Sequence, residues 1–135
     1  MTNYQSVSGS SAENLFIELF SDTFGVKKAG YLYSQYHFYD IYQNSRYADF
    51  LLENGGKKIA IEIDDEASHN PSLVSRNKFY DDLLKQNSMV YLGWDVYRWA
   101  VHQLQQQPEL VKDELRIFLG QHPHFREIED YLPTQ

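Results

Sequence analysis

Two adjacent glycines near the middle of the chain constrain its fold more than any other feature. The segment 44–64, NSRYADFLLENGGKKIAIEID, places Gly55 and Gly56 between two runs of β-forming residues. A Gly-Gly pair in this setting is typical of a two-residue hairpin turn. With that turn Glu53 faces Lys58, which makes a favourable cross-strand ion pair. The sequence therefore predicts a β-hairpin with a defined register.

The same register brings acidic residues together at the far end of the hairpin. Asp49 falls opposite Glu62, and directly opposed residues have Cβ atoms about 4.5–5.5 Å apart. Asp64 lies two positions further along and points to the same face as Glu62. Like charges at this spacing repel, whereas Mg²⁺ prefers oxygen ligands and is commonly held by one or two carboxylates with water. The isoleucines of 59–63 therefore predict a core face, and the acids predict a metal site.

A different turn would remove this site. A shift of one residue would put Asp49 and Glu62 on different faces, because side chains alternate along a strand. The acids would then be a chance pair on a solvated surface.

The remaining segments predict an α/β domain with a central mixed sheet of about four strands flanked by helices. The expected order is helix, three strands, helix, strand, helix. The segments are a helix over 10–25, a strand within 31–42, the hairpin 44–64, a helix over 72–88, a strand or strand pair over 89–100 broken at Gly93, a helix over 102–122 interrupted at Pro108, and a short last helix within 125–135.

The domain is expected to cover residues 11–120. Residues 1–10 are small and polar and predict a flexible lead-in, and residues 121–135 predict a C-terminal extension that could lead into a further domain. No stretch is long and apolar enough for a membrane span, and the N-terminus lacks the features of a signal peptide. The absence of cysteine excludes disulfides and thiolate metal sites and is compatible with the cytoplasm.

The net charge of −7 weighs against a free-standing nucleic-acid binder, which is usually basic. It is compatible with an acidic site that works with a divalent cation, because the ion offsets the carboxylates.

The order of several short motifs resembles the PD-(D/E)XK nuclease superfamily, and its Vsr-like, very-short-patch-repair branch in particular. The motifs are SSAENLF, ADFLL, AIEIDDEASHN, SRNKFYDDLL and YLGWDVYRW, and the resemblance covers about residues 10–100. It implies a restriction-endonuclease-like fold and a Mg²⁺- or Mn²⁺-dependent endonuclease that hydrolyses DNA. A fused helicase or restriction partner is typical of such domains, so the chain could be an accessory part of a larger enzyme.

The resemblance also implies roles for individual residues. Asp49 and Glu62 correspond to metal ligands, with the Ile63 carbonyl within reach, and Glu13 on the first helix corresponds to an acid that approaches the metal from the other side. Asp64 stands where many members carry the catalytic lysine, and Asp65 replaces a frequent glycine. His69 corresponds to a histidine near the scissile phosphate.

The missing lysine leaves alternatives open. Lys57, Lys58 or Lys78 could substitute for it, or no lysine is used. Asp64 or His69 could orient or deprotonate the attacking water, and Arg76 or Lys78 could hold the DNA backbone.

Two further function classes compete with the nuclease. One is a catalytically inactive relative of the same fold that binds nucleic acid or protein. The other is an interaction domain that binds no metal.

Overall fold

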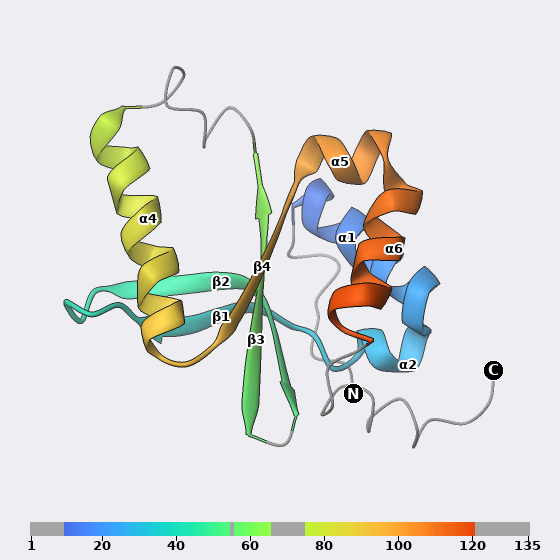
Figure 1. Cartoon of the computed structure of the whole chain (residues 1–135), viewed down its shortest axis with the longest axis horizontal. Helices are drawn as coiled ribbons and strands as arrows, with labels where there is room; N and C mark the ends of the chain where they lie inside the picture. Colours follow the sequence, from blue (N-terminus) through green and yellow to red (C-terminus); the bar gives the residue numbers. More distant parts are fainter. Residues whose placement is uncertain (1–9, 55, 66–74, 121–135) are drawn as a thin grey trace.

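The computed structural model of the protein describes residues 10–54, 56–65 and 75–120, and Figure 1 shows its elements. They are α1 (Ser11–Phe24), α2 (Val26–Ala29), β1 (Tyr33–Tyr39), β2 (Ser45–Asn54), β3 (Lys57–Asp64), α4 (Arg76–Tyr91), β4 (Asp95–Ala100), α5 (Val101–Gln106) and α6 (Pro108–Phe118).

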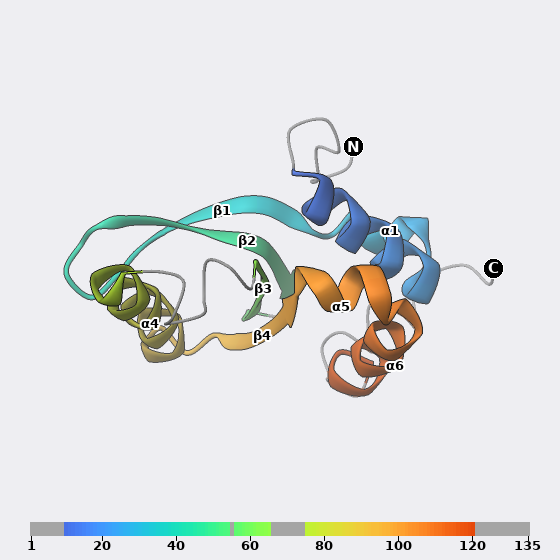
Figure 2. The same ribbon diagram turned by 90° about the horizontal axis from the view of Figure 1, so that it is seen from above.

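The strands form a single mixed sheet in the order β1-β2-β3-β4. The pairs β1–β2 and β2–β3 are antiparallel, as short connections allow, and β3–β4 is parallel. A parallel pair needs a crossover connection, and α4 is part of that connection. Figures 1 and 2 show α4 on one side of the sheet and α1, α5 and α6 together on the other. The prediction of an α/β domain with a four-stranded mixed sheet flanked by helices is confirmed.

Helix ends follow local sequence signals. The Ser10 side chain accepts a hydrogen bond from the Glu13 backbone N–H and caps α1, and Ser75 caps α4 in the same way. Gly25 ends α1 with a φ of 101°, which a residue with a side chain rarely adopts. Pro108 separates α5 from α6 because it provides no backbone N–H to continue a helix, and it begins α6 as the first helical residue.

Helix α4 extends further than the sequence predicts. Residues 89–91 were expected in a strand, but the helix continues to Tyr91, and Gly93 ends it with a φ of 87°. The physical reason is that Met89 continues the inward face of α4 and is fully buried against the sheet. Leu83 lies on the outer face of α4 and is 42% exposed.

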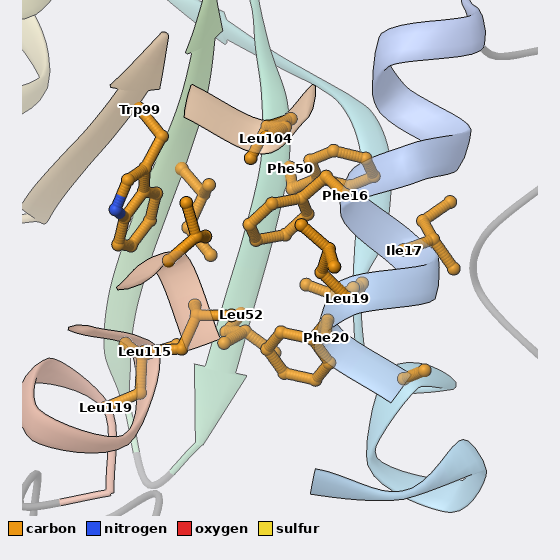
Figure 3. Packing of buried hydrophobic residues seen from close by; sticks show 14 of the residues in the cluster. Phe16, Ile17, Leu19, Phe20, Phe50, Leu52, Trp99, Leu104, Leu115 and Leu119 are labelled. Carbon is orange, nitrogen blue, oxygen red and sulfur yellow. The ribbon is translucent and has the colours of Figure 1, made fainter. Parts of the chain in front are cut away.

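The larger hydrophobic core fills the space between the sheet and α1, α5 and α6. Figure 3 shows Phe16 and Phe20 of α1 directed toward Phe50 and Leu52 of β2, and the Phe16 and Phe50 rings lie 5.1 Å apart. Trp99 of β4 packs in the same cluster, and its indole N–H donates to Glu114.

A smaller core lies between the sheet and α4. It contains Phe38, Ala48, Leu51, Ala60 and Met89. Tyr36, Trp94 and Val96, which are partly buried, pack against it.

Arg46 connects the β1–β2 hairpin with α4. Its guanidinium donates to Asp40 at 2.9 Å and makes two bonds to Asp81 at 2.7 and 2.8 Å. Burial alone raises the pKa of Asp40, but the bonds from Arg46 and from the backbone of Asn44 and Tyr42 bring it below its usual value. The link helps to fix the position of α4 over the sheet.

Candidate functional site

The candidate site lies where β2 and β3 separate. Their ladder runs from Asn54↔Lys57 to Phe50↔Ile61, as the Gly-Gly turn predicts, and then ends. Strand β3 stays paired with β4 as far as Asp64. The sheet therefore opens between β2 and β3 at the acidic end of the hairpin.

Asp49 and Glu62 occupy this opening as neighbours. The backbone N–H of Asp49 donates to Glu62 Oε2 at 2.9 Å, and the backbone N–H of Ile63 donates to Asp49 Oδ2 at 2.8 Å. In both bonds a carboxylate oxygen accepts from a backbone N–H, as a backbone carbonyl would if the β2–β3 ladder continued. These bonds lock both side chains at the point of strand separation.

Strand β1 is irregular at the same level. Gln35 stands opposite Asp49, has a φ of 54°, and interrupts the β1–β2 ladder, which resumes on both sides. Strand β2 also changes here which side of the sheet its side chains turn to. Ala48 belongs to the smaller core, whereas Phe50 belongs to the larger one. Residues two apart in a regular strand share a face, so the backbone must twist sharply at Asp49.

Lys85 approaches the opening from α4. Its Nζ donates to Glu62 Oε1 at 2.7 Å, and the Glu62 side chain is only 4% exposed. Burial raises the pKa of Glu62, and the charge of Asp49 raises it further, whereas Lys85 acts in the opposite direction. The ammonium group therefore offsets part of the charge that the two acids share.

Glu13 approaches from α1 on the other side. Gln35 Nε2 donates to Glu13 Oε2 at 2.9 Å, and the Gln35 amide lowers the pKa of Asp49. Partial burial raises the pKa of Glu13, and so does the charge of Asp49. The role of Glu13 as an acid that approaches a metal from the other side stays a prediction.

The pKa of Asp49 is also raised, chiefly by burial. The Ile63 amide and the Lys85 charge lower it, while the charge of Asp64 raises it. The charge of Asp49 thus disfavours the ionised forms of Glu13 and Glu62, and the charge of Asp64 disfavours that of Asp49. A bound cation would reverse this effect, because opposite charge favours ionised carboxylates.

Asp64 is close to this group but is engaged by Arg98 of β4. The guanidinium donates from Nε to Oδ2 at 2.7 Å and from Nη2 to Oδ1 at 2.9 Å, a bidentate pair. Arg98 also bonds Asp82 at 3.0 Å and contacts Gln86 on α4. Burial lowers the pKa of Arg98, but Asp64 and Asp82 more than compensate and raise it. This geometry suits a structural role of Asp64 better than a free catalytic base.

The other predicted cations lie elsewhere. Arg76 and Lys78 are exposed on the first turn of α4. Lys58 pairs with Glu53 at 3.1 Å, as the hairpin register predicts, and Lys57 pairs with Asp95 at 3.3 Å. Asp81 forms an ion pair with Arg46, and Asp82 forms one with Arg98. His69 lies outside the described residues.

Sequence reasoning missed Lys85 and Gln35. A signal for Lys85 was present, because it lies two helical turns after Lys78 in the crossover helix that must pack over β3. Gln35 carries no comparable signal, since its role depends on an irregular backbone within a strand.

The donor types of the site suit a hard divalent cation. The candidate ligand atoms are all oxygens, which such a cation prefers. The acids also outnumber the cations near them: the acids are Glu13, Asp49, Glu62, Asp64 and Asp82, and the cations are Lys85 and Arg98. Within residues 10–54, 56–65 and 75–120, however, no three or more His, Cys, Asp or Glu side chains are already grouped so that they could hold a metal. Both Glu62 oxygens accept hydrogen bonds, so binding would require side chains to rearrange.

Comparisons of this chain with protein-family models, curated proteins and solved structures gave no match. Among the described residues, no helix has the length and apolar character needed to cross a membrane.

Proposed function

We propose that this chain is a metal-dependent nuclease domain with a restriction-endonuclease-like fold that hydrolyses DNA phosphodiester bonds. The observation that carries the proposal is the group at the separating strands, where Asp49 and Glu62 bond each other's segments and Lys85 reaches Glu62. The order of helices and strands agrees with the one that the PD-(D/E)XK resemblance implies. The acidic net charge supports an accessory domain of a larger helicase or restriction-type enzyme, with DNA affinity supplied elsewhere.

In this proposal Asp49 and Glu62 hold Mg²⁺ or Mn²⁺, with Glu13 and the Ile63 carbonyl as further oxygen ligands. The ion, when bound, supplies Lewis acidity toward the phosphate and lowers the pKa of a water molecule. The partly buried setting strengthens charge interactions at the site relative to water.

Lys85 takes the role of the lysine that the strand motif lacks. Its Nζ lies 2.7 Å from Glu62, so it is next to the proposed ion without coming from the hairpin. There it can donate to a phosphate oxygen and stabilise the negative charge that develops during hydrolysis. Arg76 and Lys78 are exposed and available to the DNA backbone, and the role of His69 near the scissile phosphate stays a prediction.

The inactive module is the second candidate, and the charge pairing favours it. Lys85 and Arg98 already bond Glu62 and Asp64, and no ready group for a metal is present among the described residues. In this candidate the same fold binds nucleic acid or protein without cleavage.

Cleavage of supercoiled plasmid and of single-stranded DNA in Mg²⁺ or Mn²⁺ tests the proposal. Asp49→Asn and Lys85→Met should each lower the rate at least about 100-fold, the size of loss when one stabilising group leaves a transition-state site. Asp113→Asn is a matched control, since Asp113 forms an exposed pair with Arg116 on α6.

Three outcomes are distinct. Loss in the two site variants but not in the control supports the nuclease. Equal activity in all three variants refutes the assignment of the site, and an inactive parent protein favours the inactive module.

A further inference from the structure

A pocket lies at the free end of the β1–β2 hairpin, where the turn after β1 meets the last turn of α4 (Figure 1). Its volume is about 870 Å³, which is in the range of sites for small organic ligands. The almost fully buried Phe38 lines the pocket together with the exposed side chains of Ile41, Tyr91 and Leu92. Exposed apolar side chains gathered around a hollow are typical of a binding site.

Hydrogen bonds fix the two walls of the pocket relative to each other. The Ser88 Oγ of α4 accepts a bond from the Ile41 backbone N–H at 3.1 Å, which joins the turn to the helix. Asp40 accepts bonds from two backbone N–H groups of the turn at 2.8 and 2.9 Å, and from Arg46 at 2.9 Å. A preformed pocket of this kind loses little conformational entropy when a ligand binds.

The pocket offers hydrogen bonds without an accessible charge. Among the described residues that line it, Asp40 alone is charged at neutral pH, and its side chain is fully buried against Arg46 and the turn. Gln43 of the turn and Asn87 of α4 also line the pocket and are exposed, so their carboxamides can both donate to and accept from a ligand.

These groups suit a flat, neutral ring with hydrogen-bonding atoms on its edge. The Tyr91 side chain is 80% exposed and provides an aromatic face for stacking, while Ile41 and Leu92 provide apolar contact. Nucleobases stack on such aromatic side chains, and side-chain amides are regular partners of their edges.

The pocket adjoins the proposed nuclease site along α4. Ser88 follows Lys85 by three residues, so the two lie on one face of the helix and about 4.5 Å apart along its axis. A DNA strand with a phosphate at Lys85 therefore passes within reach of the pocket. Bases within a duplex are stacked and paired, so only an unpaired base can enter.

We propose that this pocket holds one unpaired base of the DNA strand that binds at the acidic opening. Tyr91 stacks on the base, and Gln43 and Asn87 bond its edge. The inference rests on the proposed function, because the strand reaches the pocket through Lys85. It adds the substrate class, which is single-stranded or locally unpaired DNA.

NMR spectroscopy of ¹⁵N-labelled protein in EDTA tests the pocket without cleavage. Adenosine should shift the side-chain amide signals of Gln43 and Asn87, whereas ribose 5-phosphate, which lacks a base, should leave them unchanged. A short single-stranded oligodeoxyadenylate should shift the same signals at a lower concentration, because its phosphates add a second contact at Lys85.

Three variants test the assigned residues by their affinity for the same oligonucleotide. Tyr91→Ala should weaken binding about tenfold, the size typical of one base–aromatic stack, and Asn87→Leu should weaken it about fivefold through the lost hydrogen bond. Tyr47→Ala is the matched control, because Tyr47 is 51% exposed and points away from α4, whereas its neighbour Ala48 packs in the smaller core beneath that helix. Its affinity should equal that of the parent protein.

The outcomes separate this inference from the proposed function. Shifts with adenosine but not with the oligonucleotide would assign the pocket to a free nucleoside and overturn its role in binding a DNA strand. No shift with either ligand, or equal affinity of Tyr91→Ala and the parent protein, would overturn the pocket even if plasmid cleavage persists. Base binding without any cleavage in Mg²⁺ would support the pocket and favour the inactive module.

Discussion

Replacing Lys85 with methionine should destabilise the protein by an amount that depends on pH. The change preserves most of the apolar stem and removes the ammonium that donates to Glu62 Oε1 at 2.7 Å. Glu62 then remains buried between β2 and β3, next to Asp49, without its nearest positive charge. The variant therefore measures how much the site depends on charge compensation from α4.

The magnitude follows from the burial of the two partners. Removing one partner of a fully buried ion pair costs about 3–5 kcal/mol, and a hydrogen bond to a charged group contributes about 1.5–3 kcal/mol. The Lys85 side chain is 18% exposed and that of Glu62 4% exposed, so water screens the pair on one side only. We expect a loss of about 2–3 kcal/mol at neutral pH, or roughly 10 °C in melting temperature for a domain of this size.

The sign of the pH dependence follows from Glu62. Its folded-state pKa is raised above the ordinary value of 4.5, chiefly by burial, so its ionisation lowers stability as pH rises through and above that value. Without Lys85 the folded-state pKa rises further, because a favourable charge is gone. The loss in Lys85→Met should therefore be largest at neutral pH and smallest below pH 4.5, where Glu62 is protonated in both states.

Urea unfolding between pH 4 and pH 8 measures this loss, and Lys112→Met provides the matched control. The Lys112 side chain is 17% exposed, almost as buried as that of Lys85, but its partner Glu109 is 82% exposed. Such a surface pair contributes about 0–1 kcal/mol. Glu62→Gln combined with Lys85→Met should recover much of the loss. The reasoning fails if Lys85→Met is no less stable than Lys112→Met, or if its loss does not change with pH.

Two further predictions concern the acid pair and the core. In urea unfolding at several pH values, Glu62→Gln alone should reduce the decline in unfolding free energy above pH 4.5. The reason is that folding raises the pKa of Glu62, and the substitution removes this group. An unchanged decline would mean that other acids cause it. Met89→Ala should lower the free energy of unfolding by about 2–5 kcal/mol, since Met89 is fully buried on α4. Leu83→Gln on the exposed face of the same helix should stay within about 0.5 kcal/mol of the parent protein, and thermal melts of both variants compare the two faces.

The β2–β3 hairpin could be predicted because its determinants are local. A two-residue glycine turn fixes the register, and the register then places Glu53 opposite Lys58 and brings Asp49 beside Glu62. The cap at Ser10 is local for the same reason, since a serine oxygen satisfies a free N–H within one turn.

The end of α4 could not be predicted from local signals. The apolar run 89–92 suits a strand or a buried helix equally well. What decides between them is the burial of Met89 against residues of β1, β2 and β3, and this depends on the crossover path of the chain.

The same limit applies to the candidate site. Asp49 and Glu62 come from one hairpin, so the hairpin register predicts that they are neighbours. Lys85 and Glu13 come from helices on opposite sides of the sheet. Gln35 reaches Glu13 through a backbone irregularity that alternation rules do not anticipate. The sequence and the family resemblance therefore pointed to Asp49, Glu62 and Glu13, but not to Lys85 and Gln35.

The charge balance of the opening favours a role beyond structure. Lys85 offsets only part of the acidic charge, and the pKa values of Glu13, Asp49 and Glu62 all remain raised. Each raised pKa means that the ionised acid destabilises the folded state at neutral pH. A bound divalent cation would convert the same repulsion into attraction, which is what the proposed function requires of these acids.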